Sequence, residues 1–163
     1  MKFVELDMGD EDMMMELLPL YQRYEAEISR EEPDLFYPAY SFDELFEHFK
    51  RYFGGKTTFI CVMDGGYKGF VTFHPDCGEV RGYADGYEGW GHMSEIYADK
   101  QLRGIGLGKA MVSKAEEELK KHNIKGIYLT DIVGNGFFWK SMDYIDTGKI
   151  EPNEGGRIYE KHV

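Results

Sequence analysis

The sequence predicts a mixed α/β domain in which helices flank one β-sheet, with the element order β-α-α-β-β-β-α-β-α-β-β. Apolar residues recur at helical spacing in several segments, and short apolar runs typical of strands lie between those segments. An Asp-Gly-Gly turn between two such runs also indicates a β-hairpin. Because 163 residues suit a domain of ordinary size, we expect one domain spanning residues 1–163.

The composition is that of a folded and strongly acidic protein. Aromatic residues make up 15% of the chain, whereas disordered chains are poor in them. The longest apolar run, Phe59 to Met63, is far shorter than the ~20 residues of a membrane-spanning helix. The net charge of −11 disfavours nucleic acid as a partner and fits a cationic small molecule or peptide. With two cysteines and early acidic residues where a signal peptide is apolar, we expect a reduced cytoplasmic protein with no membrane partner.

The first third of the chain predicts one strand and two helices. Residues 1–6 form the strand, and Asp10 caps a helix that runs from Glu11 to about Ser29. Ser41 and Glu44 match the S-x-x-E capping box, which places the start of the second helix at Ser41. We expect the apolar stripe of the first helix to face the core; it consists of Leu17, Leu20, Tyr21 and Tyr24.

The next segments predict a hairpin and a long glycine-rich loop. The hairpin strands are 58–63 and 67–73, which flank Asp64-Gly65-Gly66. Residues 75–91 contain five glycines among aromatic and acidic side chains. Two interpretations of this loop stay open: it faces a cationic ligand, or it is a wide turn between two strands.

The second half of the chain alternates strands with helices. We expect strands at 92–98 and 127–132, a helix that ends near His122 and a short helix over 135–142. Two final strands cover 144–147 and 157–161. One face of the longer helix repeats apolar residues every four positions: Leu107, Met111, Ala115 and Leu119.

A glycine-rich turn between a strand and a helix carries the strongest chemical signal. It reads Arg103-Gly104-Ile105-Gly106-Leu107-Gly108-Lys109. The first N–H groups of a helix have no intrahelical partner, and glycines allow a phosphate to approach them, so the turn predicts a phosphate or pyrophosphate site. It fits neither the P-loop nor the dinucleotide-binding fingerprint, because their glycine spacings fail here. The alternative is a tight turn without a ligand.

Residues 95–111 resemble the acyl-CoA signature of the GNAT superfamily of N-acetyltransferases. The signature is [QR]-x-x-G-x-[GA] after a strand, and Arg103, Gly106 and Gly108 fill its fixed positions. Gln101, Gly104 and Gly106 also satisfy it in an alternative register, which begins two residues earlier. The order of the predicted elements also matches the GNAT fold, so the resemblance covers most of the chain.

The resemblance implies an enzyme that transfers an acetyl group from acetyl-CoA to a primary amine of a small molecule or peptide, without a metal. A homodimer is compatible with this interpretation. The resemblance further implies that backbone N–H groups of the turn bind the CoA pyrophosphate and that the end of the preceding strand pairs with the pantetheine arm. The implied cofactor-binding residues are Ile96, Tyr97, Ala98, Arg103, Gly104, Ile105, Gly106, Leu107, Gly108, Lys109, Asn135 and Trp139.

The predicted catalytic groups depart in part from the family pattern. Glu95 lies on the strand beside the predicted thioester, where some members place a general base; the alternative is a solvated strand glutamate. Trp139 stands where many members carry a tyrosine proposed as the acid for the leaving thiolate, and an indole does not release its proton at neutral pH. This substitution keeps a second function open, a non-catalytic acyl-CoA-binding module. His74, Cys77 and His92 match no standard zinc spacing.

Overall fold

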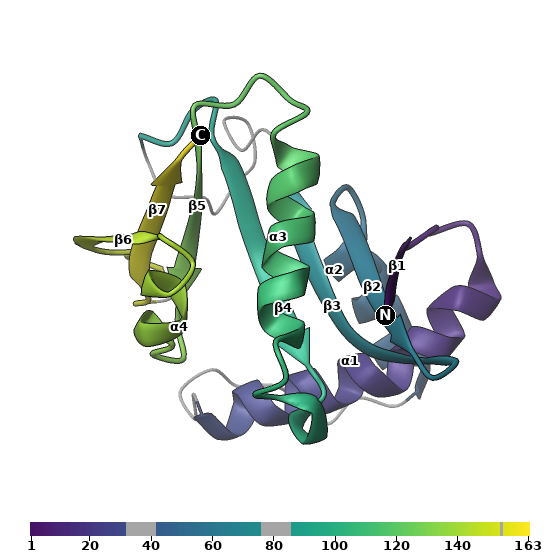
Figure 1. Cartoon of the computed structure of the whole chain (residues 1–163). Helices are drawn as coiled ribbons and strands as arrows, with labels where there is room; N and C mark the ends of the chain where they lie inside the picture. The colour runs from purple at the N-terminus through teal and green to yellow at the C-terminus, as the bar shows by residue number, and fades with distance from the viewer. Residues whose placement is uncertain (32–41, 76–85, 154) are drawn as a thin grey trace.

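The computed structural model contains a seven-stranded sheet with helices on both faces (Figure 1). It describes residues 1–31, 42–75, 86–153 and 155–163. The strand order is β1-β2-β3-β4-β5-β7-β6, and β4 with β5 is the only parallel pair within the described ranges. The strands are β1 Lys2–Glu5, β2 Thr57–Met63, β3 Gly66–His74, β4 Gly91–Ala98, β5 Gly126–Asp131, β6 Ile145–Ile150 and β7 Arg157–His162.

Helices α1 and α2 cover one face of the sheet. α1 spans Glu11–Glu31 and α2 spans Phe42–Phe53. The α1 stripe predicted from the sequence is buried, and it packs with α2 rings and with apolar side chains of β2 and β3. This packing forms a cluster that includes Leu17, Leu20, Tyr21, Tyr24, Phe49, Phe53, Ile60 and Phe70.

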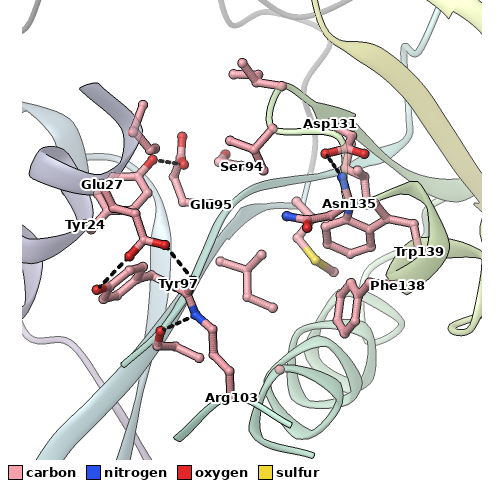
Figure 2. Close-up of a pocket in the computed structure, with 18 of the residues that line it drawn as sticks. Tyr24, Glu27, Ser94, Glu95, Tyr97, Arg103, Asp131, Asn135, Phe138 and Trp139 are labelled. Atoms are coloured by element: carbon pink, nitrogen blue, oxygen red, sulfur yellow. Dashed lines mark hydrogen bonds and ion pairs between the residues drawn. The ribbon is translucent and has the colours of Figure 1, made fainter. Parts of the chain in front are cut away.

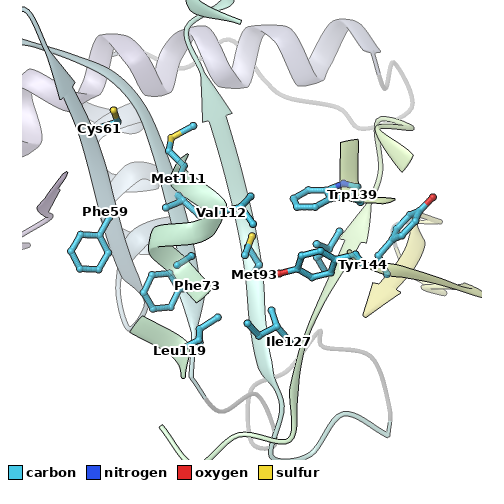
Figure 3. Close-up of a cluster of buried hydrophobic side chains, with 14 of the residues drawn as sticks. Phe59, Cys61, Phe73, Met93, Met111, Val112, Leu119, Ile127, Trp139 and Tyr144 are labelled. Carbon is cyan, nitrogen blue, oxygen red and sulfur yellow. The ribbon is translucent and has the colours of Figure 1, made fainter. Parts of the chain in front are cut away.

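Helix α3, Leu107–Leu119, covers the opposite face and the short helix α4, Gly136–Lys140, adds to the same cluster (Figure 3). The predicted face of α3 is fully buried, because its residues pack on β2, β3 and β4. The cluster on this side includes Phe59, Cys61, Val71, Phe73, Met93, Met111, Val112, Leu119, Ile127, Trp139 and Tyr144.

The β2–β3 hairpin forms at the predicted turn. Met63 pairs with Gly66, so the loop has two residues, Asp64 and Gly65. Both have positive φ angles, 49° and 75°. A two-residue loop with this backbone matches the right-handed twist of the flanking strands, which explains why an Asp-Gly pair occupies it.

A bulge in β4 divides the side chains of this strand between the two faces of the sheet. Phe73 pairs with Met93 and Thr72 pairs with Glu95, which leaves Ser94 as the extra residue. Met93 therefore packs in the cluster beneath α3, whereas Glu95, only two residues later, contacts Tyr24 of α1.

Strands β4 and β5 pair at one end only and then diverge (Figure 1). The paired positions are Gly91 with Ile127 and His92 with Tyr128. Beyond them, β5 pairs with β7 on its other side and β4 pairs with β3. The edges of β4 and β5 that face each other consequently hold backbone groups without a ladder partner.

The predicted element order is confirmed, with small differences at the ends of elements. A 3-10 helix, η1 Lys100–Leu102, separates β4 from the glycine-rich turn and was not predicted. The capping box at Ser41, and Cys77 with most of the 75–91 loop, lie outside the described residues. The described end of that loop packs inward, since Tyr87 is buried and stacks on Tyr128 at 4.1 Å. In the described parts of the chain, no helix is both long and apolar enough to cross a membrane.

Candidate functional site

A cavity of about 480 Å³ occupies the space where β4 and β5 diverge (Figure 2). Residues 93–98 line one side and residues 129–133 line the other. The glycine-rich turn and the first turn of α3 contribute Arg103, Gly104, Gly106, Gly108 and Lys109, while α1 contributes Tyr24, Glu27 and Ile28. Asn135, Phe138 and Trp139 complete the described wall.

The glycine-rich turn presents unpaired backbone N–H groups at the N-terminus of α3. Gly104 and Gly106 have φ angles of 85° and 91°, which side chains rarely adopt. The N–H of Ala110 donates to the Gly106 carbonyl, so the N–H groups of residues 107–109 precede the first helical hydrogen bond. A Cβ atom at Gly108 would lie 3.4 Å from the Phe138 ring, whereas Cβ atoms at Gly104 and Gly106 would meet open space.

The Arg103 side chain connects this turn to β4 and α1. Its Nε donates to the Ala98 carbonyl at 3.2 Å, and its Nη1 donates to Glu27 at 2.6 Å. The guanidinium also lies over the Tyr97 ring, 5.5 Å from its centroid. The hydrogen bond from Arg103 lowers the pKa of Glu27 against a smaller opposing effect of burial. Glu27 is therefore held as a carboxylate beside the turn.

Glu95 points into the α1 side of the cavity, where two tyrosines meet it. The Tyr24 hydroxyl donates to the Glu95 carboxylate, and the hydroxyls of Tyr24 and Tyr52 lie 3.1 Å apart. Burial, and secondarily the Glu95 charge, raise the pKa of Tyr52 well above its ordinary value of 10.0. Tyr52 therefore keeps its proton, and the Glu95 carboxylate lies beside the hydroxyls of Tyr24 and Tyr52.

The β5 wall holds a third carboxylate and the downstream aromatic residues. Asp131 is 7% exposed and accepts a hydrogen bond from the Asn135 N–H at 2.9 Å, which fixes the start of α4. Trp139 is 5% exposed and packs edge-to-face with Phe138 and Tyr144. Its ring is thus both a wall of the cavity and part of the core (Figures 2 and 3).

Three tyrosines are candidates to replace the missing acid at position 139, and only Tyr97 lines the cavity. Its hydroxyl lies 3.4 Å from Glu27, at the end near the glycine-rich turn. Tyr128 is stacked between Tyr87 and His92, away from the wall. Tyr144 is buried beneath Trp139, and burial raises its pKa strongly.

The structure brings most of the predicted site residues together around one cavity. Glu95 and ten of the twelve predicted cofactor-binding residues line the cavity. Ile105 and Leu107 do not, because Ile105 is 62% exposed on the outside of the turn and the Leu107 side chain is buried in the core. Ile105 and Leu107 could therefore contact the cofactor only through their backbone groups. The cofactor contacts of all twelve residues stay a prediction.

Sequence reasoning missed the contributions of α1 and β5. Tyr24 was assigned to the core stripe, and it is indeed buried, but its hydroxyl reaches Glu95. Glu27 follows Tyr24 by three residues, a spacing that places both on one helix face and was available as a signal. Asp131 had no comparable signal, since its place opposite Glu95 depends on the divergence of the strands.

The described residues hold no group of three or more His, Cys, Asp or Glu side chains arranged for a metal ion. His92 lies under the stacked Tyr128 ring, and burial lowers its pKa to about 3. Its Nδ1 lies 3.3 Å from the Ser94 hydroxyl. Cys77, the third residue considered for zinc, lies outside the described residues.

Solved structures share this fold at low sequence identity. A ribosomal-protein-alanine N-acetyltransferase from Brucella melitensis matches with a TM-score of 0.69 and 15% identity, covering 100% of both chains. A tetramutant of the BH1408 protein from Bacillus halodurans matches with a TM-score of 0.67 and 17% identity, over 91% of this chain and 96% of that one.

A third structure, a candidate streptothricin acetyltransferase from Bacillus anthracis, was solved in complex with acetyl coenzyme A. It matches with a TM-score of 0.54 and 18% identity, over 66% of this chain and 62% of that chain.

The sequence itself matches a family model over most of its length. No curated protein matches the chain. The model of the acetyltransferase (GNAT) family, however, matches residues 17–138, a range that contains most of α1, the bulged strand β4, the glycine-rich turn and the first residues of α4. With the fold and the cavity described above, this match identifies the chain as a member of the GNAT acetyltransferase family.

Proposed function

We propose that this protein transfers an acetyl group from acetyl-CoA to a primary amine, with Glu95 as the general base. The observation that carries the proposal is a single cavity with unpaired helix N–H groups at one end and a hydrogen-bonded carboxylate on its wall. The first feature suits a pyrophosphate and the second suits the proton of an attacking amine.

The described residues fit acetyl-CoA as a substrate. The amides of residues 107–109, together with Lys109, provide donors and positive charge for the pyrophosphate. The unpaired edge of β4 at Ile96 to Ala98 offers backbone groups to the amides of the pantetheine arm. A structural relative binds acetyl coenzyme A, which supports the same choice here.

The chain's own groups would manage the protons of the reaction. Acetyl-CoA supplies the activated acyl thioester. Glu95 accepts the proton that the amine loses as it attacks, directly or through one water. Trp139 retains its indole proton, so the thiol leaves as the anion, which its pKa of ~8.5 permits, or takes a proton from Tyr97 or water.

We infer a cationic acceptor, either a small molecule or a peptide amine. The cavity wall carries the carboxylates of Glu27, Glu95 and Asp131 and the rings of Tyr24 and Tyr97. Carboxylates and aromatic faces both attract ammonium groups. The net charge of −11 adds long-range attraction of the same sign, and a cytoplasmic location is part of this proposal.

The test is release of CoA from acetyl-CoA with a panel of primary amines, compared between the parent and Glu95→Gln. We expect the variant to turn over more slowly, mainly at lower pH where the amine most needs a base, and to bind acetyl-CoA with nearly the parent affinity in calorimetric titration. Overlaying pH profiles would remove Glu95 from the mechanism. No CoA release by the folded parent with any amine would remove the transferase.

The second candidate function is a non-catalytic acyl-CoA-binding module. Trp139 favours it, because this buried indole occupies the position of the usual acid. A binding module titrates with acetyl-CoA and releases no CoA above background. Absence of acetyl-CoA binding would leave only a structural domain with an empty glycine-rich turn.

A further inference from the structure

A chain of hydrogen bonds runs from α2 through α1 to the cavity wall. The Tyr24 hydroxyl donates to the Glu95 carboxylate, and the Tyr52 hydroxyl lies 3.1 Å from that of Tyr24. A phenol has a single proton. Tyr24 gives its proton to Glu95, and Tyr52 is hydrogen-bonded to both Tyr24 and Glu95, so both phenols contact the carboxylate.

Packing holds both rings in the geometry that this chain of donors requires. Tyr24 is 6% exposed and meets Phe70 and Tyr97 edge-to-face, with centroids 5.4 and 5.7 Å away. The Tyr52 ring packs edge-to-face on Phe53 at 5.0 Å. Neither phenol can swing away without disturbing this aromatic cluster, so Glu95 meets a fixed donor.

We propose that Tyr24 and Tyr52 are positioning residues that hold the Glu95 carboxylate toward the cavity and keep it ionised for its role as base. This inference rests on the function proposed above and extends it to residues of both helices on that face of the sheet. Hydrogen-bonded groups polarise one another, so Tyr52 reinforces the bond from Tyr24 in addition to its own contact with Glu95.

Burial raises the pKa of Tyr52 well above 10.0, so Tyr52 keeps its proton near neutral pH and serves as a hydrogen-bond donor.

Among the residues that the structure describes, few other charged groups face this trio. Lys56 lies over the Tyr52 ring, 4.7 Å from its centroid, and the His48 ring is 6.3 Å from it. Glu27 and Tyr97 flank the site toward the glycine-rich turn. From β3, the residue paired with Glu95 is Thr72, which does not titrate. Tyr24 is accordingly the group whose removal should change the titration of Glu95 most.

The decisive experiment measures the titration of the Glu95 carboxyl by carbon NMR in the parent, Tyr24→Phe, Tyr52→Phe and the double variant, without acetyl-CoA or amine. Loss of a donor to the carboxylate favours its protonated form, so Tyr24→Phe should raise the midpoint by about one pH unit. Tyr52→Phe should raise it by less. The double variant should raise it further than Tyr24→Phe alone, because Tyr52 also contacts Glu95 directly.

Tyr21→Phe is the matched control, since it removes a hydroxyl from the same helix that contacts Glu25 instead. It should leave the midpoint unchanged. The same shifts should appear in the acid limb of the kcat/KM pH profile. This limb should move to higher pH in Tyr24→Phe and should return to its parent position when tyrosine is restored at position 24.

Two outcomes would overturn the proposal: an unchanged Glu95 midpoint in Tyr24→Phe, or a double variant whose midpoint shifts no further than that of Tyr24→Phe. If Tyr24→Phe does not fold, Tyr52→Phe and its smaller shift carry the test. A parent that shows the expected midpoints but releases no CoA would refute the transferase and leave the hydrogen-bond chain intact.

Discussion

The guanidinium of Arg103 lies 2.6 Å from the carboxylate of Glu27, which ties the glycine-rich turn to helix α1. A second ion pair, Arg23 with Asp99 at 3.5 Å, joins the same helix to the end of β4. The predicted cofactor end of the cavity and the helix that carries Tyr24 are therefore connected directly. Changing either partner of the first pair should affect acetyl-CoA binding, and with opposite signs.

Glu27→Gln should tighten acetyl-CoA binding, whereas Arg103→Ala should weaken it. The first change leaves the Arg103 charge unneutralised beside the turn, and the second removes that charge together with its bond to the Ala98 carbonyl. Because Arg103 is 42% exposed, solvent screening limits each effect to roughly threefold to tenfold in Kd. Calorimetric titration at two salt concentrations measures both. Equal changes of the same sign would contradict this account.

The same ion pair should make stability depend on pH in a defined window. Arg103 holds the pKa of Glu27 below its ordinary value of 4.5, so the pair stabilises the fold fully above that pH and loses its effect as pH falls through the folded-state pKa. At pH 7 we expect Glu27→Gln to cost about 0.5 to 1 kcal/mol. In urea unfolding from pH 7 down to pH 3, the unfolding free energy of the parent should converge on that of Glu27→Gln at the acid end. A difference in unfolding free energy that stays constant with pH would show that the cost of the substitution does not come from the ion pair.

Substitutions in the glycine-rich turn should separate backbone strain from cofactor binding. Gly106→Ala places a side chain at a φ of 91°, so it should lower the unfolding free energy by about 1 to 2 kcal/mol. Gly108→Ala lies in the first turn of α3, where alanine favours the helix and its Cβ only touches Phe138. We therefore expect Gly108→Ala to fold with parent stability yet bind acetyl-CoA more weakly, as calorimetry would show. Unchanged affinity in Gly108→Ala and Gly108→Val would exclude the turn as the pyrophosphate site.

Substitutions of Trp139 should distinguish the enzyme from the binding module. Trp139→Phe removes no acid, so an active transferase should keep most of its turnover while losing about 1 to 2 kcal/mol of stability to a cavity beside Tyr144. Trp139→Tyr supplies a phenol at the same place and should raise turnover. CoA release and thermal unfolding measured together check both. A collapse of turnover in folded Trp139→Phe with intact acetyl-CoA affinity would show that the indole takes part in the reaction.

The fold was predictable because its local signals agree with one another. The Asp64-Gly65 turn, the α1 stripe and the four-residue repeat of α3 each specify an element without reference to the rest of the chain, and each forms where it was expected. The 3-10 helix Lys100–Leu102 was not predicted, because Asp99 creates it by accepting the Gln101 N–H, a local hydrogen bond that leaves no periodic pattern.

The candidate site was predictable where recognisable motifs lie in the sequence. Residues 95–111 carry the strand end and the glycine-rich turn, which line part of the cavity, and the downstream motif adds Asn135 and Trp139. Tyr24, Glu27 and Asp131 come from elements that are distant in sequence, so nothing in their local pattern announces that they meet Glu95 or the turn. Tyr87 lies in the 75–91 loop, for which a ligand-facing loop and a wide turn were both open. Its ring is buried against Tyr128, a long-range contact that its aromatic and acidic neighbours in the sequence do not indicate.

The sequence by itself determined the elements, their order and the unpaired amides at the start of α3, because these depend on backbone preferences and on periodicities within single segments. Only the tertiary structure decided which face Glu95 occupies. The extra residue at Ser94 reverses the alternation of β4, so Met93 enters the core beneath α3 and Glu95 meets Tyr24 on the other side. A bulge is a property of two paired strands, and so is the divergence of β4 from β5 that opens the cavity.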